Sequence, residues 1–229
     1  METFYNGFTL DTPEGTFPLS TDSILLADFV RLPRNAQVLD FGSGSGTLGI
    51  LLCARDDNCR VTGLELEETA HRAALENIAR NGLDARMSSI CTDLRSIPPQ
   101  LTPGSFEVCI SNPPYFTGGP ASLATPLARR DDFCTSLELF QVAGKMLKFG
   151  GDFCLVHKPE RLAQLCAQAS EYKLEPKRLC LIRHREDGPV SLILLSCRKG
   201  AKPGLTWEER CLFHKDGTPT EYYRNLYHL

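Results

Sequence analysis

An amide, two prolines and a phenol stand together at Asn112, Pro113, Pro114 and Tyr115, directly after the apolar run at 106–110. Proline has a fixed φ and no backbone N–H, so this pair gives up two donors and holds the nearby carbonyls rigidly. An amide oxygen beside rigid carbonyls suits a site that accepts hydrogen bonds from an amino group. The alternative is a stiff exit from a strand into a loop, without chemistry.

A second candidate group is the segment 40–46, with the sequence DFGSGSG, which follows an apolar run and precedes a helical pattern. Glycine lets a ligand approach the backbone, and open α/β sheets bind ligands at the carboxyl ends of their strands. The dinucleotide fingerprint needs glycine where Thr47 stands, and a P-loop needs Gly-Lys before Ser or Thr. The segment instead resembles the S-adenosylmethionine loop of class I methyltransferases. That resemblance implies cofactor contacts at Asp40, Gly42, Ser43, Gly44 and Gly46, and the alternative is a glycine-rich turn that binds nothing.

Two further acidic residues end apolar runs that we expect to be strands. Glu65 closes the run 59–65, where a carboxylate can accept hydrogen bonds from both ribose hydroxyls of a nucleoside. NAD enzymes share this feature, so Glu65 predicts a nucleoside ligand without naming it. Asp93 follows the next run and could take an adenine amino group, or it could cap a turn.

With such a loop upstream in the chain, the tetrapeptide resembles the (Asp/Asn/Ser)-Pro-Pro-(Tyr/Phe/Trp) signature of amino methyltransferases. The exocyclic amine of a base is a poor nucleophile because its lone pair is delocalised into the ring. The Asn112 side-chain oxygen and the Pro113 carbonyl would hold its two N–H bonds and favour a lone pair that faces the methyl group. Tyr115 would stack on the flipped base. The resemblance implies Asn112, Pro113, Pro114 and Tyr115 as catalytic residues, with Asn112 also at the cofactor.

Nearly the whole chain resembles bacterial tRNA(valine) adenine-N6 methyltransferases, which act on the adenine beside the anticodon. The likeness rests on FPLSTDSILLADFV (17–30), the glycine loop, SNPPYF (111–116), ATPLARR (124–130) and the tail 212–229. It implies S-adenosylmethionine as cofactor and tRNA as partner, with residues 20–26 over the methionine end of the cofactor and Asp22 as the polar candidate. Pro219 departs from the pattern, because a β-former or a helix cap is expected there.

The motif by itself leaves the substrate open. Amino methyltransferases that modify an rRNA guanine, a DNA adenine or a protein glutamine are alternatives, and so is a catalytically silent nucleotide-binding or RNA-binding module. DNA enzymes usually carry a target-recognition domain, for which no residues are left over here. A pure binding module would have no use for an amine-polarising tetrapeptide.

Charge is divided unevenly along the chain. Residues 1–144 carry 10 Lys and Arg against 18 Asp and Glu, whereas residues 145–229 carry 15 against 10. A basic half can meet a polyanion, although solvated side chains give the same balance. We expect RNA contacts, independent of RNA sequence, from basic residues near strand ends. The candidates are Arg129, Arg130, Arg183, Arg185, Arg198, Lys199 and Lys202.

The order of elements predicts the fold. Strands are expected at 36–42, 59–67, 85–93, 106–112, 151–158, 177–184 and 190–198, and helices at 47–55, 68–82, 134–149 and 159–172. Alternating strands and helices indicate an α/β fold with a mostly parallel sheet and helices on both faces. The last two strands are joined by only REDGP, which is too short for a helical crossover, so they should pair antiparallel. The expectation is a Rossmann-like class I methyltransferase fold of seven strands with an antiparallel last strand.

Composition and length complete the expectation. The 229 residues, with 42% hydrophobic and 23% charged, fit one domain (1–229), divided into a cofactor-capping segment (1–35), a catalytic core (36–198) and a C-terminal extension (199–229). The ten cysteines lie mostly in apolar runs without metal-ligand or disulfide spacing, so we expect reduced core thiols and no metal. With no apolar run of membrane length and no signal-peptide pattern, we expect a cytoplasmic enzyme away from membranes, monomeric by default.

Overall fold

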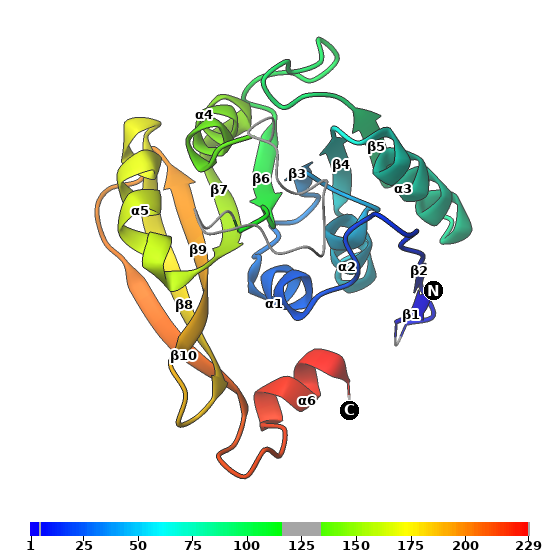
Figure 1. Ribbon diagram of the computed structural model, residues 1–229. Helices are drawn as coiled ribbons and strands as arrows, with labels where there is room; N and C mark the ends of the chain where they lie inside the picture. The colour runs from blue at the N-terminus through cyan, green and yellow to red at the C-terminus, as the bar shows by residue number, and fades with distance from the viewer. Residues whose placement is uncertain (5, 116–133, 229) are drawn as a thin grey trace.

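A computed structural model describes residues 1–4, 6–115 and 134–228 of the chain. It is built around one twisted sheet flanked by helices (Figure 1). The strands of this sheet are β3 (Gln37–Phe41), β4 (Arg60–Glu65), β5 (Met87–Cys91), β6 (Phe106–Ser111), β7 (Leu147–His157), β8 (Leu174–Arg185), β9 (Val190–Lys199) and β10 (Thr206–Phe213).

The strand order is β10-β8-β9-β7-β6-β3-β4-β5. The strands β5, β4, β3, β6 and β7 run parallel, whereas β9 is antiparallel to both of its neighbours, β7 and β8. All seven predicted strands are present with the predicted antiparallel pairing. The predicted number of strands is nevertheless too low, because β10 adds an eighth. It is the outermost strand of the sheet and runs parallel to β8. These residues were expected in the C-terminal extension and not in a strand, since only one of the eight in TWEERCLF is buried.

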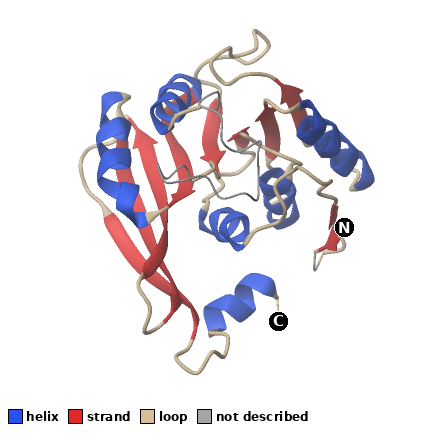
Figure 2. Ribbon diagram, viewed as in Figure 1, coloured by secondary structure: helices blue, strands red, loops and turns tan. Residues whose placement is uncertain are grey.

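Helices cover both faces of the sheet (Figure 2). Side chains alternate between the faces of a strand, so Val38 belongs to one buried cluster and Leu39 to the other. The first cluster includes side chains of α1 (Thr21–Phe29), α2 (Thr47–Arg55) and α3 (Glu68–Arg80). The second includes α4 (Ser136–Met146) and α5 (Leu162–Glu171), and η2 (Pro159–Arg161) leads into α5. The predicted helices are therefore present, although α4 ends at Met146 and not near the glycine pair at 150–151, because β7 already begins at Leu147.

Contacts at the two ends of α1 tie it to α2 and cap its first turn. The Arg55 guanidinium donates to three carbonyls at its C-terminal end, those of Ala27, Asp28 and Val30. At its N-terminal end, Ser20 is the N-cap, and its Oγ accepts from the backbone N–H of Ser23. A helix anchored at both termini can hold its first turn at a defined place.

The C-terminal helix α6 (Glu221–Tyr227) packs against α1 (Figure 1). The Tyr227 hydroxyl lies 3.0 Å from Thr21 Oγ1, and the Tyr222 hydroxyl donates to Asp28. Pro219 pairs with Phe213 in an isolated bridge, and the helix cap is supplied one residue later by Thr220, whose Oγ1 accepts from the Tyr223 N–H. The proline therefore does not prevent the terminal helix from docking.

A short ribbon, β1 (Glu2–Thr3) and β2 (Thr9–Leu10), lies beside α3. The buried Asn77 side chain links this N-terminal segment to the glycine loop, because its Nδ2 donates to the carbonyls of both Asp11 and Ser45. The ten cysteines are free thiols, and six of them are buried. Cys91 is exposed, so it does not belong to the predicted set of core thiols.

Candidate active site

The glycine loop leaves the carboxyl end of β3 and enters α2. Gly42, Gly44 and Gly46 have φ of 67°, 55° and 85°, a left-handed region that strongly favours glycine. The loop folds back on the next strand, since the Gly42 and Ser43 N–H groups both donate to the carbonyl of Leu64. A Cβ added at Gly42 or Gly44 would meet no atom within 4 Å. The loop backbone therefore borders open space at the strand ends, as expected for a cofactor site.

Glu65, at the end of β4, is hydrogen-bonded to the glycine loop. One carboxylate oxygen accepts from the Gly44 N–H over 2.7 Å, and the other accepts from the Glu67 N–H over 2.8 Å. A carboxylate has about four lone-pair sites, so each oxygen keeps capacity for a further donor. Glu65 can thus shape the loop and still receive ribose hydroxyls.

Asp40 is fully buried at the end of β3, and neither carboxyl oxygen has a hydrogen-bond partner among the described residues. Burial, and secondarily the charge of Glu65, raises the pKa of Asp40 to about 8. The hydroxyls of Ser43 and Ser45 are likewise buried without a partner in the described part of the chain. Buried acceptors without donors are costly. This set therefore fits a polar ligand that brings its own donors, as the amino and hydroxyl groups of S-adenosylmethionine would.

Asp93 follows β5 and is engaged within the protein. Both of its carboxylate oxygens accept from the Arg95 guanidinium, and Oδ1 also accepts from the Arg95 N–H. The hydrogen bonds to Arg95 lower the pKa of Asp93. This geometry matches the turn-capping alternative, and an adenine amino group would have to share the carboxylate with Arg95.

Asn112 follows β6, which lies beside β3 in the sheet, with Ser111 opposite Phe41. The tetrapeptide and the glycine loop therefore leave neighbouring strands at the same edge. The Asn112 amide is oriented from α1, since its Nδ2 donates to the buried Ser23 Oγ over 3.0 Å. Its Oδ1 accepts only a long contact of 3.5 Å from the Tyr115 hydroxyl among the described residues. The amide nitrogen thus donates to the protein, and the amide oxygen remains available to accept from a ligand.

Tyr115 is held by the same turn of α1. Its hydroxyl donates to Asp22 Oδ2 over 2.6 Å, and burial together with this bond raises the pKa of the phenol. The ring lies 5.3 Å from that of His157 at the end of β7, and Lys158 Nζ lies 5.0 Å from the ring centroid. Sequence reasoning placed Asp22 at the cofactor, and the structure gives it a protein partner, Tyr115.

The predicted RNA-binding residues fall in separate places. Arg183 and Arg185 end β8, at the edge of the sheet where β7 also ends. Arg198 and Lys199 end the antiparallel strand β9 and so lie at the opposite edge, with Lys202 just beyond them. Arg129 and Arg130 lie outside the described residues.

Several of these cations have protein partners. Arg183 pairs with Glu209, Arg185 with Asp187, and Arg198 with Asp152, while Lys199 Nζ donates to the Leu147 carbonyl. Arg198 and Lys199 therefore lie at the opposite ends of the strands from the glycine loop and Asn112.

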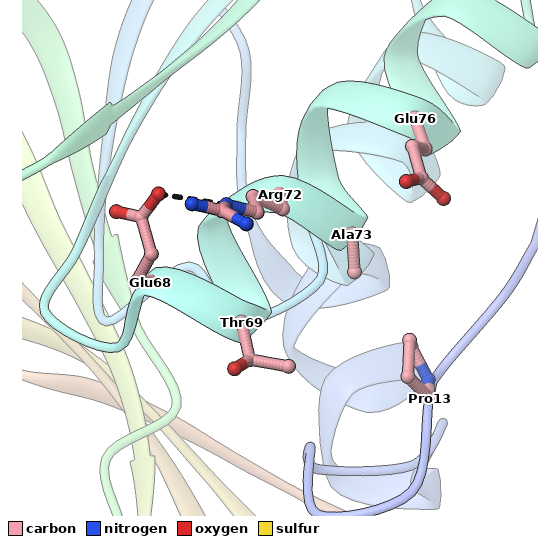
Figure 3. Close-up of a pocket in the computed structure, with 6 residues that line it drawn as sticks. All are labelled: Pro13, Glu68, Thr69, Arg72, Ala73 and Glu76. Atoms are coloured by element: carbon pink, nitrogen blue, oxygen red, sulfur yellow. Dashed lines mark hydrogen bonds and ion pairs between the residues drawn. The ribbon is translucent and has the colours of Figure 1, made fainter.

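Two surface cavities lie apart from the glycine loop and the tetrapeptide. One, of about 300 Å³, is lined by residues of α3 and by Pro13, and in it Arg72 pairs with Glu68 (Figure 3). The other, of about 480 Å³, lies at the opposite edge of the sheet and includes Phe149, Asp152 and Arg198. Neither contains the glycine loop or the tetrapeptide.

Three residues at the site were not singled out from the sequence, namely Ser23, His157 and Lys158. Ser23 lies inside the segment 20–26 that the family resemblance assigned to the cofactor, so its neighbourhood was predicted and its contact with Asn112 was not. His157 and Lys158 end a predicted strand, and their position at a carboxyl end was the available signal.

Comparison with known proteins agrees with this geometry. The family model described as "Methyltransferase small domain" matches residues 19–164, which include the glycine loop and the tetrapeptide. The chain belongs to the methyltransferase small domain family. This methyltransferase is also similar to curated proteins named tRNA1(Val) (adenine(37)-N6)-methyltransferase. The protein of Photobacterium profundum is 26% identical over 93% of this chain and 90% of the relative. The protein of Shewanella halifaxensis is 31% identical over 76% of this chain and 70% of the relative.

Solved structures show the same fold. A predicted O-methyltransferase from Agrobacterium tumefaciens aligns with a TM-score of 0.75 and 21% identity, over 91% of this chain and 96% of that chain. A methyltransferase from Pyrococcus furiosus aligns with a TM-score of 0.63 and 20% identity, over 84% and 89%. These structures confirm the predicted class I fold, and the family match together with the relatives confirms the prediction of an S-adenosylmethionine-dependent methyltransferase.

Neither a metal-binding group nor a membrane-spanning helix is present among the described residues. No group of three or more His, Cys, Asp or Glu among them could hold a metal ion. No helix within the same ranges is long and apolar enough to cross a membrane.

Proposed function

We propose that this methyltransferase transfers a methyl group from S-adenosylmethionine to the N6 amine of an adenine in tRNA, specifically the adenine beside the anticodon of a valine tRNA. The observation that carries the proposal is the Asn112 amide, whose donor is bound by Ser23 and whose oxygen is left as an acceptor at the end of β6. The substrate follows the names of the curated relatives, which span most of this chain.

The proposed cofactor site is assembled from the carboxyl ends of β3, β4 and β6. When bound, S-adenosylmethionine supplies a methyl group on a positively charged sulfur. Glu65 would accept the ribose hydroxyls, and the buried Asp40 carboxyl would take donors that the protein itself does not provide. The remaining proposed contacts are Asp22, Gly42, Ser43, Gly44, Gly46, Asp93 and Asn112.

The reactive tetrapeptide would act on the amine by position and electrostatics. Asn112 Oδ1 and the Pro113 carbonyl accept the two N–H bonds of the adenine amine, which fixes the nitrogen and turns its lone pair away from the ring. These acceptors are set before the substrate arrives, so they do not have to reorganise during the reaction. Tyr115, anchored by Asp22, presents its ring to the flipped base. Pro114 fixes the chain direction between the two.

Basic residues near the same edge of the sheet would bind the RNA backbone. Arg183 and Arg185 lie at the end of β8, on the side of the sheet where Tyr115 lies. The cluster of Arg198, Lys199 and Lys202 would need an RNA that reaches the opposite edge, so it is the weaker part of the proposed surface.

Labelled-methyl transfer to tRNA tests the proposed function. The purified protein should methylate a tRNA fraction that contains valine tRNA, and nucleoside analysis should recover the label as N6-methyladenosine. Label on guanosine, on DNA adenine or on a protein glutamine would favour the corresponding alternative substrate. No transfer to any of these acceptors, with cofactor binding retained, would favour a silent binding module.

A further inference from the structure

Two cations lie at the ends of the short helix η2 that follows β7, Lys158 as its N-cap and Arg161 as its last residue. The Arg161 N–H donates to the Lys158 carbonyl over 3.1 Å, and Pro159 occupies the first position of the turn. This tight turn brings Lys158 and Arg161 to the carboxyl edge of the sheet, where β3 and β6 also end. Lys158 Nζ lies 5.0 Å from the centroid of the Tyr115 ring. Lys158 is therefore beside the ring proposed to stack on the target base, and Arg161 ends the turn that begins at Lys158.

Neither cation is neutralised within the described part of the chain. The side chains of Lys158 and Arg161 make no hydrogen bond or ion pair there, and the acid in the same turn, Glu160, pairs with neither. Their charges nevertheless converge on His157, beside Tyr115. Burial lowers the pKa of His157, the charges of Arg161 and Lys158 lower it further, and Glu160 opposes them.

The contrast with the other basic residues is chemical. Arg183, Arg185 and Arg198 each have a carboxylate partner that a phosphate would have to displace. An exposed arginine without such a partner can bind a phosphate bidentately, and lysine binds it as a point charge. Within the described residues, Lys158 and Arg161 are thus available to an anion without breaking an ion pair.

We infer that Lys158 and Arg161 bind the RNA phosphates that flank the methylated nucleotide. The inference rests on the proposed function, because it takes RNA as the polyanion. A base rotated onto Tyr115 leaves its own phosphates at the mouth of the site, within reach of cations placed around that ring. Phosphate contacts of this kind position the substrate without reading its sequence.

The test compares two double variants with the same change in charge. Lys158→Met/Arg161→Met removes the proposed pair, and Lys145→Met/Arg34→Met removes two exposed cations from segments that precede β7 and β3, at the opposite edge of the sheet. The dissociation constant for valine tRNA is measured across a series of salt concentrations. Each lost contact to single-stranded phosphate reduces the slope of log K against log salt by about 0.7. The Lys158/Arg161 variant should therefore lose roughly 1.4 from its slope, and the control variant should keep the wild-type slope.

Binding of S-adenosylhomocysteine, followed by calorimetry, should be unchanged in both double variants, which shows that each still folds. Equal slopes for the two variants, with salt-dependent binding by the wild type, would overturn this inference and leave the proposed function standing. A wild-type protein that binds the tRNA without salt dependence and transfers no methyl group to it would contradict both this inference and the proposed function.

Discussion

Ser23 and Asn112 lie 89 residues apart in the chain, yet the Asn112 amide donates to Ser23 Oγ over 3.0 Å. The serine belongs to the first turn of α1 and the asparagine to the end of β6, so the contact joins the N-terminal segment to the reactive tetrapeptide. The bond determines which end of the amide faces the ligand, because a carboxamide carries a donor and an acceptor.

Removing this bond should slow methyl transfer without weakening cofactor binding. In Ser23→Ala the amide can rotate, and a lost neutral hydrogen bond costs about 0.5–1.5 kcal/mol, which corresponds to roughly a 2- to 12-fold fall in kcat. Ser196→Ala, a buried serine on β9, is the matched control and should leave kcat unchanged. Ser23→Ala introduced into an Asn112→Ala background should have little further effect. An undiminished effect there would mean that Ser23 does not act through Asn112.

The Tyr115 hydroxyl predicts a second effect on positioning. From the sequence alone, Tyr115→Phe should be mild, because the stacking ring is kept. The 2.6 Å bond to Asp22 indicates that the hydroxyl also fixes the ring. Tyr115→Phe should therefore raise KM for tRNA measurably, whereas Tyr115→Ala should raise it more, since stacking contributes roughly 1–3 kcal/mol per base. Steady-state kinetics of both variants at saturating cofactor check this order. A phenylalanine variant with the wild-type KM would show that the bond to Asp22 does not position the Tyr115 ring.

Gly63 lies in β4 and touches no proposed ligand, but it controls the glycine loop. A Cβ at this position would meet Ser43 Oγ at 2.5 Å and Ser43 Cβ at 2.8 Å, so the loop would have to move. Gly63→Ala should weaken binding of S-adenosylhomocysteine. Gly188→Ala is the control, because its added Cβ meets no atom closer than 3.4 Å and its φ is an ordinary one. Calorimetry on both variants decides, and equal affinities would show that the loop tolerates the displacement.

The raised pKa of Asp40 predicts a pH dependence of stability. Its folded pKa of about 8 lies above the ordinary value of 3.8, so the folded state binds the proton more tightly than the unfolded chain. Its contribution is therefore fully present below pH 3.8 and is lost as the pH rises toward 8. Asp40→Asn, which resembles the protonated acid, should lose less stability than wild type between pH 5 and pH 8, a window within that range.

Thermal unfolding at a series of pH values measures this difference in the absence of cofactor. Parallel curves for wild type and Asp40→Asn would show that Asp40 ionises normally in the folded protein. Glu65 is the neighbouring acid that also raises the pKa of Asp40, so Glu65→Gln should move the wild-type curve part of the way toward that of Asp40→Asn.

Much of the fold and of the site followed from short-range patterns. Apolar runs alternating with helical spacing identified seven strands, and the five-residue REDGP connection required an antiparallel pair. Glycine spacing after a strand and the rigid tetrapeptide placed the two loops at strand ends. Such features depend only on neighbouring residues, because glycine and proline allow or exclude particular backbone conformations wherever they occur.

The remainder depended on contacts between distant segments. The strand β10 buries only one of its eight residues, so periodicity did not reveal it, and its place beside β8 is a tertiary pairing. The bonds of Ser23 to Asn112 and of Asp22 to Tyr115 join segments about ninety residues apart. The ion pair of Arg198 with Asp152 joins residues 46 apart, and clusters in the sequence gave no sign that this arginine already has a partner.

The last prediction concerns Asn112 itself. If the tetrapeptide only stiffened a loop, Asn112→Ala would change stability slightly and leave methyl transfer nearly intact. If the amide oxygen holds the target amine, the variant loses one of two acceptors placed before the reaction. The loss of one such preorganised hydrogen bond costs about 10²–10³ in rate. KM for S-adenosylmethionine should change little, because most of the proposed cofactor contacts, those of the glycine loop and Glu65, are untouched, and kcat should fall. Single-turnover transfer to tRNA, which excludes product release, measures the effect directly. A rate near that of the wild type would leave the two prolines and their asparagine with a structural role alone.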